Sequence, residues 1–429
     1  MTRSFLRCSN PACATEVSEP GIAFGCPACG GLVEVGYQID EPHPDRWPAL
    51  WRGRQGSGSV ADRSGVWRFR ELLPFLADDQ EPISLGEGST PLVSAPGAAS
   101  WAGLEHLQVK HQGVNPTGSF KDLGMTACIS HAVAQGAEMV ACASTGNTSA
   151  SMAAYAARAG IRALLFIPGG AISSAKLAQA TDFGALVVEA GSNFDQSLKI
   201  LRLAATALGC YVVNSINPYR LEGQKTLVAE LLEQRGWLVP DCIVVPGGNL
   251  GNVSSIAKGL AELLGFGLIG KLPRLIVVQA DGADPFFRLW SSGSLVLEPV
   301  LDPETRATAI RIGNPANWPK ALRALRWTDG TCESVSDAEI GAAKDALSRD
   351  GIGCEPASAT TVAGLRKLRA AGQIEPEADV VAILTGHQLK DVDYIIEQRT
   401  ATERRLHLGK EPDRETAPEV IAAWLATLS

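Results

Sequence analysis

The chain has 429 residues, of which 45% are hydrophobic and 20% charged, with 44 glycines and a formal net charge of −8 at pH 7. This length exceeds the size at which one hydrophobic core keeps growing, so we expect two domains and a small appendage. The composition is that of a soluble α/β enzyme and excludes a disordered or fibrous chain. The acidic balance argues against a nucleic-acid partner, because such a partner is recognised by clustered positive charge.

The N-terminus, MTRSFLRCSNPAC, lacks the apolar stretch and the cleavage site of a secretory signal. No later run reaches the roughly 18 apolar residues that would span a bilayer, so no membrane partner is expected. We therefore expect a cytoplasmic protein. In that reducing compartment its ten cysteines are expected to be thiols or metal ligands.

Four cysteines crowd into the N-terminal segment, residues 1–40. Cys8 and Cys13 are separated by four residues and Cys26 and Cys29 by two, and both pairs lie among turn-forming residues. Zinc prefers four soft ligands at such short spacings, and a segment of this size cannot bury a core of its own. The pattern predicts a zinc-ribbon-like knuckle with a structural Zn²⁺. Four buried or idle thiols are the alternative.

Residues 41–84 are rich in Pro, Trp, Arg and Gly and show no sustained period. They are expected to form a connector that wraps the main body. The aromatic residues Trp47, Trp51 and Trp67 are predicted to cover apolar surface rather than to bind a ligand.

From residue 85 onwards, short apolar runs alternate with amphipathic helical stretches. This alternation predicts parallel sheets with helices on both faces, and hence an α/β fold with two doubly wound domains. We expect residues 85–240 to form a smaller first domain, whose edges could pack with the second, residues 241–400. Residues 401–429 are expected to form a charged helical tail. The predicted strands are 138–144, 162–168, 185–190, 210–214, 241–246, 274–280 and 379–385, and the predicted helices are 148–158, 173–183, 193–208, 222–234, 252–264, 337–348 and 358–370.

One lysine, Lys121, follows small and turn-forming residues in NPTGSFKDLG and precedes a helix-capable stretch. A lysine that forms a Schiff base must lose its proton near neutral pH, although its ordinary pKa is about 10.4. A sheltered turn supplies that condition, and a carbonyl cofactor is one of the few reasons to build such a site. A solvated surface charge is the alternative.

The segment DCIVVPGGNLGN, residues 241–252, is predicted to be a buried strand, a proline stop and a glycine-rich turn that opens a helix. Backbone N–H groups at such a turn converge on an anion, and the helix N-terminus adds its positive dipole end. A phosphate would fit there; a loop that only packs helix against sheet is the alternative. The segment matches neither a Walker loop nor G-x-G-x-x-G, which argues against a nucleotide.

Two further polar elements follow predicted strands, and in parallel sheets ligands bind at the carboxyl ends of strands. In STGNTS, residues 144–149, Asn147 could hold a ring hydroxyl of a cofactor, or the segment could simply cap a helix. Thr385 ends another buried strand in AILTGHQLKD. Its hydroxyl could hydrogen-bond a pyridine nitrogen without keeping it cationic; an ordinary turn residue is the alternative.

Together these elements make the chain resemble the fold-type-II family of pyridoxal-phosphate enzymes, and within it the threonine synthases. Motifs of that family occur in order over most of residues 85–391: GEGSTPL, NPTGSFKD, ASTGNTSAS, NSINPYRLEGQKT, PGGNLGN, AIRIGNP, EPASA and LTGHQLKD. A short N-terminal cysteine segment also occurs in some relatives. The chain departs from the family at Leu123, where Arg is common, at Gln388, where Gly is usual, and in the wide spacing of Cys8 and Cys13.

The resemblance implies a role for each site residue. Lys121 would be the Schiff-base lysine and general base, Asn147 would contact the 3-hydroxyl of pyridoxal 5'-phosphate, and Thr385 would face its ring nitrogen. The cofactor's phosphate would lie on Gly247, Gly248, Asn249, Leu250 and Gly251. The substrate, O-phosphohomoserine, would have its phosphate bound by Ser144, Thr148, Asn214, Ser215, Arg220 and Asn249. Because relatives are often dimers, a homodimer is implied as well.

The implied reaction is that of a lyase, in which O-phospho-L-homoserine loses its γ-phosphate and gains water at Cβ to give L-threonine. Arg220 supports this independently, because a guanidinium fork is a natural partner for a phosphate; a surface ion pair is the alternative. One rival function is another fold-type-II enzyme that acts at Cβ, such as a threonine dehydratase or a cysteate synthase-like enzyme. A second rival is an inactive zinc-ribbon binding protein, against which Lys121 and the acidic balance argue.

Overall fold

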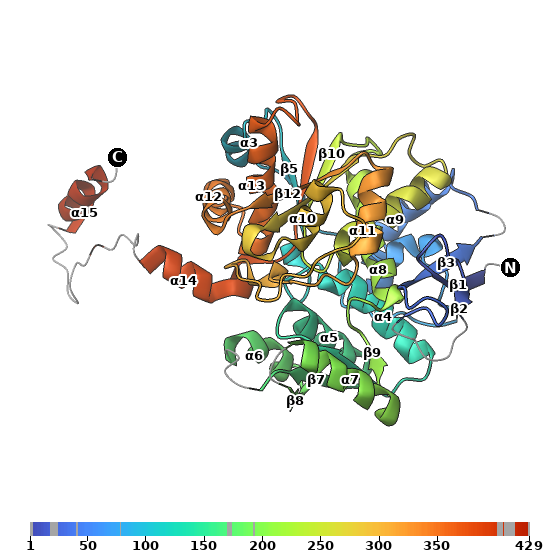
Figure 1. The fold of residues 1–429 in the computed structure, drawn as a ribbon. Coiled ribbons are helices and arrows are strands. Elements are labelled where there is room, and N and C mark those ends of the chain that lie inside the picture. Colours follow the sequence, from blue (N-terminus) through green and yellow to red (C-terminus); the bar gives the residue numbers. More distant parts are fainter. Residues whose placement is uncertain are drawn as a thin grey trace. The chain divides into compact units, whose positions relative to one another are not determined.

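The structure is a computed structural model that describes residues 3–17, 25–39, 42–77, 79–169, 174–191, 194–400, 406 and 417–427. The chain divides into two compact units, Met1–Lys390 and Asp391–Ser429. The second unit contains the helices α14 (Val392–Thr400) and α15 (Ala417–Ala426), of which α15 lies in the predicted tail. The first unit contains three sheets (Figure 1).

The largest sheet has six strands in the order β12-β11-β10-β13-β5-β4. All neighbouring strands are parallel except β4 and β5. Ile243 and Val245 of β10 lie in the core on one face, and Val244 lies in the core on the other. Both faces are buried, which explains why these strands are continuous apolar runs in the sequence. The bounds are β4 Leu92–Ser94, β5 Gln108–His111, β10 Cys242–Pro246, β11 Arg274–Ala280, β12 Thr331–Val335 and β13 Val380–Leu384.

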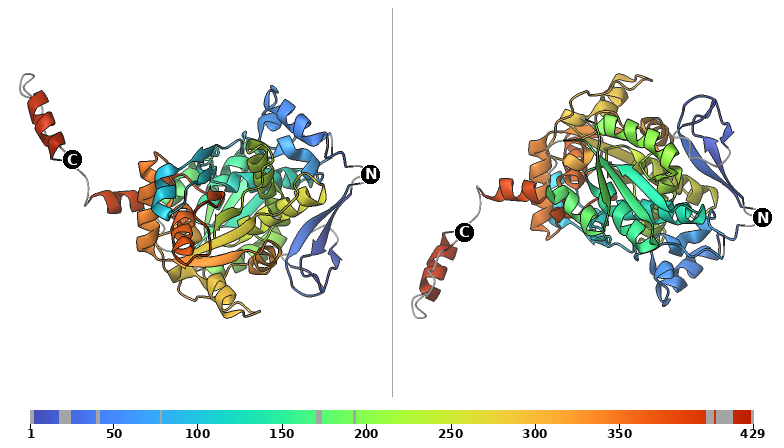
Figure 2. Two further views of the ribbon diagram at one scale, coloured as in Figure 1. Left: turned by 90° about the horizontal axis from the view of Figure 1, so that it is seen from above. Right: turned by 90° about the horizontal axis from the view of Figure 1, so that it is seen from below.

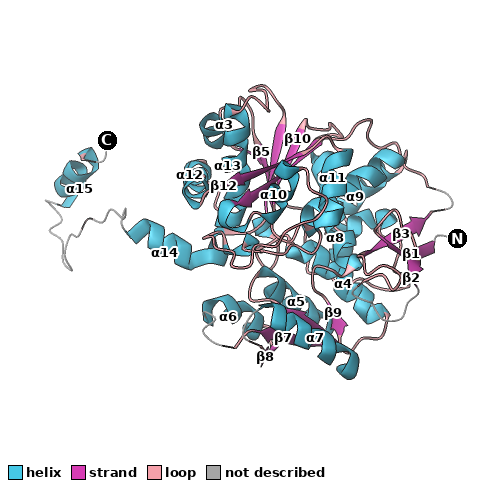
Figure 3. Ribbon diagram, viewed as in Figure 1, coloured by secondary structure: helices cyan, strands magenta, loops and turns pink. Residues whose placement is uncertain are grey.

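Helices cover both faces of this sheet (Figure 3). On one face lie α3 (Pro96–Ala102), α12 (Asp337–Arg349) and α13 (Pro356–Ala370). On the other lie α1 (Trp47–Gln55), α8 (Pro218–Gln234), α9 (Gly251–Gly265), α10 (Pro285–Ser292) and α11 (Trp318–Trp327). Helix α8 begins earlier than predicted because the Asn217 side chain caps it and a proline occupies its first turn.

The second sheet has four parallel strands in the order β8-β7-β6-β9. Its strands are β6 Met139–Ala143, β7 Arg162–Ile167, β8 Leu186–Glu189 and β9 Tyr211–Val212. The helices α4 (Lys121–Ala134), α5 (Asn147–Ala159) and α6 (Ser174–Asp182) contribute to the core on one face, and α7 (Phe194–Leu208) packs on the other. The view from below in Figure 2 shows this sheet in teal and green. The predicted α/β class with two doubly wound sheets is therefore confirmed.

The strands before residue 240 do not all belong to one sheet, although residues 85–240 were expected to form the first domain. All the strands predicted from the apolar runs are present, but β4, β5 and β12 were not predicted. Both β4 and β5 precede residue 240 and yet pair within the six-stranded sheet, so a cut at that residue would divide this sheet. The pairing of β5 with β13 brings the carboxyl ends of two strands together, and the segment around Lys121 begins just after β5.

The connector between the N-terminal segment and the sheets contains α2 (Val60–Arg63) and the 3₁₀ helix η1 (Trp67–Leu72). Trp47, Trp51 and Trp67 are buried in the core that includes α8 and α9, as the sequence predicted. The Trp67 indole donates to the Thr126 hydroxyl of α4 over 2.7 Å. The connector thus seals apolar surface beside α4 and α8. The other 3₁₀ helices are η2 Gln112–Val114, η3 Asp281–Ala283, η4 Thr308–Ile310 and η5 Gln388–Asp391.

The N-terminal segment forms a three-stranded antiparallel sheet in the order β2-β1-β3. Its strands are β1 Arg3–Cys8, β2 Glu16–Val17 and β3 Val33–Gln38, drawn in dark blue in Figure 1. Within the described ranges, no helix is both long and apolar enough to cross a lipid bilayer.

Helices α4 and α8 cross at two glycines. A Cβ on Gly223 of α8 would overlap the carbonyl oxygen of Leu123, and a Cβ on Gly124 of α4 would lie 2.7 Å from the Arg220 carbonyl oxygen. The two backbones can approach this closely only without side chains at the crossing. The crossing lies at the start of both helices, so it brings Lys121 and Arg220 into the same region.

Candidate active site

The loop before Lys121 is folded by a buried carboxylate. Asp122 accepts hydrogen bonds from the Thr117 backbone N–H (2.7 Å), the Thr117 hydroxyl (2.6 Å) and the Ser151 hydroxyl (2.6 Å). Gly118 adopts a φ of +86°, which favours glycine and lets the chain turn back. Burial raises the pKa of Asp122 to about 6, although its hydrogen bonds favour the ionised form. This arrangement fixes where α4 begins and therefore where Lys121 lies.

The Lys121 amine lies in a region that disfavours its charged form. Burial and the positive charge of Arg220 lower the pKa of Lys121 to about 7, against the opposing attraction of Glu355. The Nζ atom lies 4.1 Å from the centroid of the Phe120 ring, and within the described residues no hydrogen bond engages it. This environment favours the neutral amine, which is the form that acts as a nucleophile or a base.

One buried carboxylate, Glu355, joins two of the predicted site residues. The Asn147 amide donates to Glu355 Oε2 over 3.0 Å, and the Thr385 hydroxyl donates to Oε1 over 3.1 Å. The Ser358 and Thr385 hydroxyl oxygens are 3.1 Å apart. Burial raises the pKa of Glu355, and the two donors and Lys121 oppose that shift. Asn147 and Thr385, which come from elements of different sheets, therefore meet beside Lys121.

Sequence reasoning missed Glu355 and Ser358 as site residues. Both belong to EPASA, which contributed to the family resemblance but received no role. The available signal was a glutamate directly before the proline of a small-residue helix, a position where an acidic side chain ends up at the helix N-terminus. Nothing local indicates that this carboxylate meets Asn147, because the two residues are far apart in the chain.

The glycine-rich turn after β10 forms a cradle of backbone donors. A Cβ on Gly247 would lie 2.7 Å from side-chain atoms of β11, so only glycine fits the packing there. Leu250 adopts a φ of 62°, which turns the chain sharply into α9. Within the described residues, the N–H groups from Gly248 to Gly251 have no protein acceptor. Unpaired N–H groups at a helix N-terminus are the donor set that binds a phosphate.

A second candidate binding group is the buried guanidinium of Arg220. The Arg220 guanidinium donates to the Val213 carbonyl oxygen over 2.9 Å, and its Nε is buried without a partner. No carboxylate pairs with it among the residues the structure describes. Burial lowers the pKa of this guanidinium, but the group remains cationic. A buried cation without an anionic partner is costly, so an external anion would stabilise it.

The other residues predicted to bind the substrate phosphate lie at strand ends of the small sheet and in the glycine-rich turn. Asn214 bridges to Ala143 through two hydrogen bonds, of 3.0 and 3.1 Å, at the end of β6. The Asn249 amide donates to the Ser215 hydroxyl over 2.6 Å, which joins the two sheets. Ser144 and Thr148 are half-buried at the start of α5, and within the described residues no hydrogen bond joins their side chains to this set.

A further candidate was not predicted. Asn252, in the first turn of α9, is buried, and both polar atoms of its amide lack a partner. It lies next to the glycine-rich cradle in the chain and could donate to the same anion.

The side chains at two departures from the family pack against other parts of the structure. The Leu123 side chain is buried in the core shared with Trp67 and Leu227. The Gln388 side chain packs over Gly353, where a Cβ would collide with it. Both side chains are uncharged, so neither adds a charge to the surroundings of Lys121.

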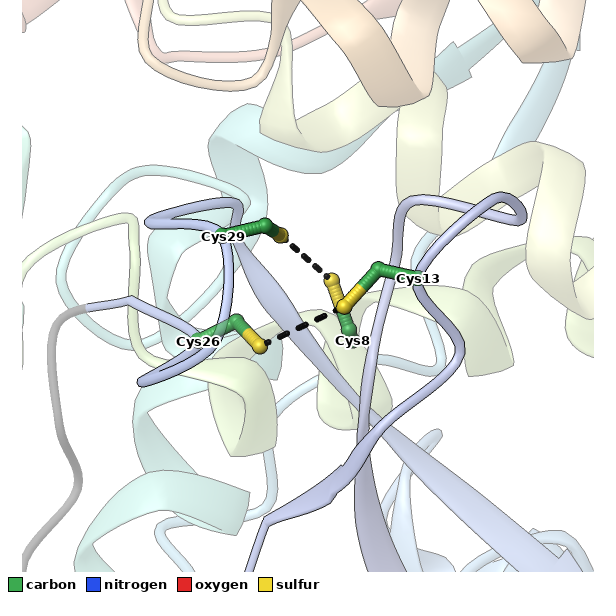
Figure 4. Close-up of side chains that lie close together, drawn as sticks. All are labelled: Cys8, Cys13, Cys26 and Cys29. Atoms are coloured by element: carbon green, nitrogen blue, oxygen red, sulfur yellow. Dashed lines mark hydrogen bonds between the residues drawn. The ribbon is translucent and has the colours of Figure 1, made fainter.

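The four N-terminal cysteines converge, as Figure 4 shows. Their sulfur atoms all lie within 4.8 Å of one another, with Cys8 and Cys29 3.5 Å apart and Cys13 and Cys26 3.8 Å apart. Sulfurs bonded to a tetrahedral Zn²⁺ at about 2.3 Å would be about 3.8 Å apart, so the donor set and its size fit that ion. The wider Cys8 to Cys13 spacing does not prevent the convergence.

Comparison with known proteins agrees with this geometry. Residues 83–386 match the family described as pyridoxal-phosphate dependent enzyme. The chain is 44% identical over 386 residues to threonine synthase of Methanosarcina acetivorans, covering 90% of this chain and 92% of that one. It is also 44% identical over 391 residues to threonine synthase of Methanocaldococcus jannaschii, covering 91% and 94%.

Solved structures with lower identity share the fold. Maize serine racemase superimposes with a TM-score of 0.62 at 20% identity, covering 82% of this chain and 97% of that one. A fungal L-serine ammonia-lyase from Rhizomucor miehei gives a TM-score of 0.63 at 22% identity, covering 75% and 99%.

Proposed function

The chain belongs to the pyridoxal-phosphate-dependent enzyme family, among its threonine synthases, and we propose that it converts O-phospho-L-homoserine and water into L-threonine and phosphate. One observation carries the substrate assignment. The Lys121 amine, whose pKa is lowered to about 7, is influenced by the charge of Arg220, a buried cation that has no carboxylate partner among the described residues. A substrate that carries both an amine and a phosphate complements this pair.

The residues present fit pyridoxal phosphate. Its phosphate would lie on the cradle formed by Gly247, Gly248, Asn249, Leu250 and Gly251. The N–H groups from Gly248 to Gly251 are unpaired within the described residues, whereas the Gly247 N–H donates to the Val278 carbonyl oxygen over 2.7 Å. Lys121 would hold its aldehyde carbon, Asn147 its 3-hydroxyl and Thr385 its ring nitrogen. When bound, the group supplies an electron sink that stabilises negative charge beside the substrate's amine. Asn147 and Thr385 would have to turn from Glu355 towards the ring.

The chain's own residues would then handle the proton and the leaving group. Lys121 Nζ, with a pKa of about 7, would accept the proton from the substrate's Cα. Arg220 would balance the charge that develops on the departing γ-phosphate. The remaining polar groups proposed to contact that phosphate are Ser144, Thr148, Asn214, Ser215 and Asn249.

A turnover assay on the full chain loaded with pyridoxal phosphate tests this function. We expect phosphate and threonine in equal amounts from O-phosphohomoserine, and no product from Lys121→Ala. Ammonia and a keto acid from threonine, with no phosphate release from O-phosphohomoserine, would instead identify the rival enzyme that acts at Cβ. A protein that takes up no cofactor would support the inactive binding protein.

Arg220 offers a sharper test of the substrate's phosphate. In Arg220→Met we expect the KM for O-phosphohomoserine to rise roughly 10- to 100-fold, because a hydrogen bond to a charged group contributes about 1.5–3 kcal/mol. Arg158→Met, at an exposed position of α5, should leave the KM unchanged. An unaltered KM in the Arg220 variant would remove the basis for the phosphate subsite.

Three further assignments belong to this proposal. The cysteine knuckle is proposed to hold a structural Zn²⁺ on Cys8, Cys13, Cys26 and Cys29, which metal analysis of the purified protein would test. The protein is proposed to be a homodimer in solution, which light scattering would test. A cytoplasmic location is proposed as well, and cell fractionation would test it.

A further inference from the structure

The N-terminal sheet packs on the body through a small apolar patch. Leu6 of β1 and Val35 of β3 are buried together with Tyr219, which lies in the first turn of α8. The Tyr219 ring in turn stacks on His131 of α4, with ring centroids 3.4 Å apart. Tyr219 is therefore held between the N-terminal sheet and α4, and the next residue in the chain is Arg220.

Lysines from two helices donate to the backbone of β3. Lys258 of α9 donates to the Val35 carbonyl oxygen over 2.6 Å, and Lys320 of α11 donates to the Val33 carbonyl oxygen over 2.8 Å. Lys258 also forms an ion pair with Glu222 of α8, which pairs with Lys225 over 2.6 Å. The strand β3 is thus the common partner of helices α8, α9 and α11.

Two of these helices carry proposed anion-binding groups, and the residue before the third contacts Ser215, which is proposed to bind the same anion. Arg220 and Glu222 lie one turn or less apart on α8, and α9 begins at the glycine-rich cradle. Asn317, directly before α11, donates to the Ser215 carbonyl oxygen over 3.2 Å. A shift of β3 would therefore act on each helix that positions the proposed phosphate subsite.

The contact between sheet and body consists of separate links. A cavity of about 210 Å³ lies at the junction, and residues from both sides line it. They include Arg7 and Glu34 of the sheet, Lys258 and Glu262 of α9, and Lys320 and Arg323 of α11. Arg323 of α11 adds two further links, an ion pair with Glu34 (2.7 Å) and a hydrogen bond to the Ser9 carbonyl oxygen (2.9 Å). Because the junction is not packed continuously, these separate links position the sheet.

Cysteines make up most of a small buried cluster at one end of the N-terminal sheet. The small cluster at that end of the sheet contains Cys8, Cys26 and Val33, so thiols take the place of a hydrophobic core. Cys8 pairs with Val33 in the strand register, so the sulfur site and the first residue of β3 are neighbours. A segment this small needs a metal or another cross-link to hold its shape.

We propose that Zn²⁺ bound by Cys8, Cys13, Cys26 and Cys29 holds β3 against α8, α9 and α11, and thereby controls the affinity of the anion subsite at Arg220. The metal acts at a distance through Tyr219, Glu222 and Lys258, without touching substrate. The identity of the substrate's anion rests on the proposed function, but the coupling itself does not.

The test uses the full chain with pyridoxal phosphate bound, so that the cradle is filled, and inorganic phosphate as the probe. Titration calorimetry would give the Kd for phosphate before and after removal of the metal by a chelator. We expect removal to weaken phosphate binding by at least roughly fivefold, the lower end of typical coupling between sites, and re-addition of Zn²⁺ to restore it. Cofactor content, read by absorbance, should not change.

Two variants distinguish the effect of losing the metal from the effect of losing the Lys258 contact with β3. Cys29→Ser, at an exposed position of the site, should lose Zn²⁺ and show the weakened phosphate Kd. Lys258→Met should keep Zn²⁺, show a weakened Kd, and no longer respond to chelator. Cys210→Ser, a partly buried thiol outside the site, is the matched control and should behave as the wild type.

Hydrogen exchange provides a reading that does not depend on any ligand. We expect metal removal to speed amide exchange in the first turns of α8 and leave α13 unchanged. The proposal is wrong if the protein binds no metal, or if it binds metal and its removal alters neither the phosphate Kd nor the exchange of α8. A chain that shows the coupling but makes no threonine would overturn the proposed function and leave this inference standing.

Discussion

At the scale of single residues, the site is governed by two opposite charges around one amine. Arg220 disfavours the ammonium form of Lys121, and Glu355 favours it. Burial is the largest cause of the lowered pKa, and together with Arg220 it outweighs Glu355 and leaves the pKa of Lys121 at about 7. A base is most effective when its pKa lies close to the working pH, and a pKa of about 7 meets this condition near neutral pH.

Glu355→Gln tests this balance. The substitution keeps the shape of the side chain but removes the negative charge that stabilises the Lys121 ammonium, so the pKa of Lys121 should fall below its present value of about 7. The neutral amine should then persist to lower pH. The pH dependence of Lys121 modification by a reductive methylation reagent, followed by mass spectrometry in cofactor-free protein, measures this shift.

Glu375→Gln provides the control, because Glu375 is exposed on the loop before β13. Its titration curve should coincide with that of the wild type. A Lys121 midpoint that stays in place or moves to higher pH in Glu355→Gln would mean that Glu355 does not act on this amine.

At the scale of elements, the crossing of α4 and α8 positions the site. Lys121 begins one helix and Arg220 lies near the start of the other, so the separation of the two axes sets how the two charges interact. Gly124 and Gly223 make this separation small. A packed core transmits a displacement at the crossing because it contains few voids to absorb one.

Gly223→Ala should therefore be destabilising. Its Cβ would overlap the Leu123 carbonyl oxygen, and the helices would have to separate. We expect a loss of about 1–3 kcal/mol in the free energy of unfolding, measured by urea denaturation, together with reduced turnover.

Gly265→Ala, at the end of α9, is the matched substitution, because a Cβ there meets open space. It should stabilise the protein by roughly 0.4–1 kcal/mol. If both variants changed stability in the same direction and by the same amount, the close crossing would not be what constrains Gly223.

At the scale of the whole first unit, the connector and the N-terminal sheet complete the body. The connector buries Trp47, Trp51 and Trp67 in the core that lies on the α8 and α9 face of the large sheet. Trp51 also packs edge-on against Phe69, with ring centroids 5.0 Å apart. The face that carries the cradle helix is therefore closed by residues that contribute no chemistry.

Trp51→Ala should cost about 3–5 kcal/mol of the free energy of unfolding, because it opens a cavity in this core. Trp327→Ala makes the same substitution at a position on α11 where the tryptophan is 53% exposed. It should lower the free energy of unfolding by less than about 1 kcal/mol. Denaturant titration of both variants measures the difference. Similar losses in the two would contradict the sealing role of the connector.

The fold class and most of the strands could be predicted because they are local properties of the chain. A parallel strand that is buried on both faces has no solvent-facing side, so its sequence is a continuous apolar run. The run 274–280 shows this pattern and forms such a strand. The strands that were missed are short or less apolar: β4 has three residues, and β12 has the sequence TCESV. Their pairing with longer strands, rather than their own pattern, makes them strands.

The sequence alone determined the chemical groups of the candidate active site: Lys121 after a tight turn, a glycine-rich helix start and Arg220. It also determined the four N-terminal cysteines at metal-ligand spacing. Only the tertiary structure decided which of these meet. It brought Glu355 to Asn147 and Thr385, turned Leu123 into the core and placed β3 against three helices. Turn and helix signals depend on a few neighbouring residues, whereas contacts between distant segments depend on how whole elements pack.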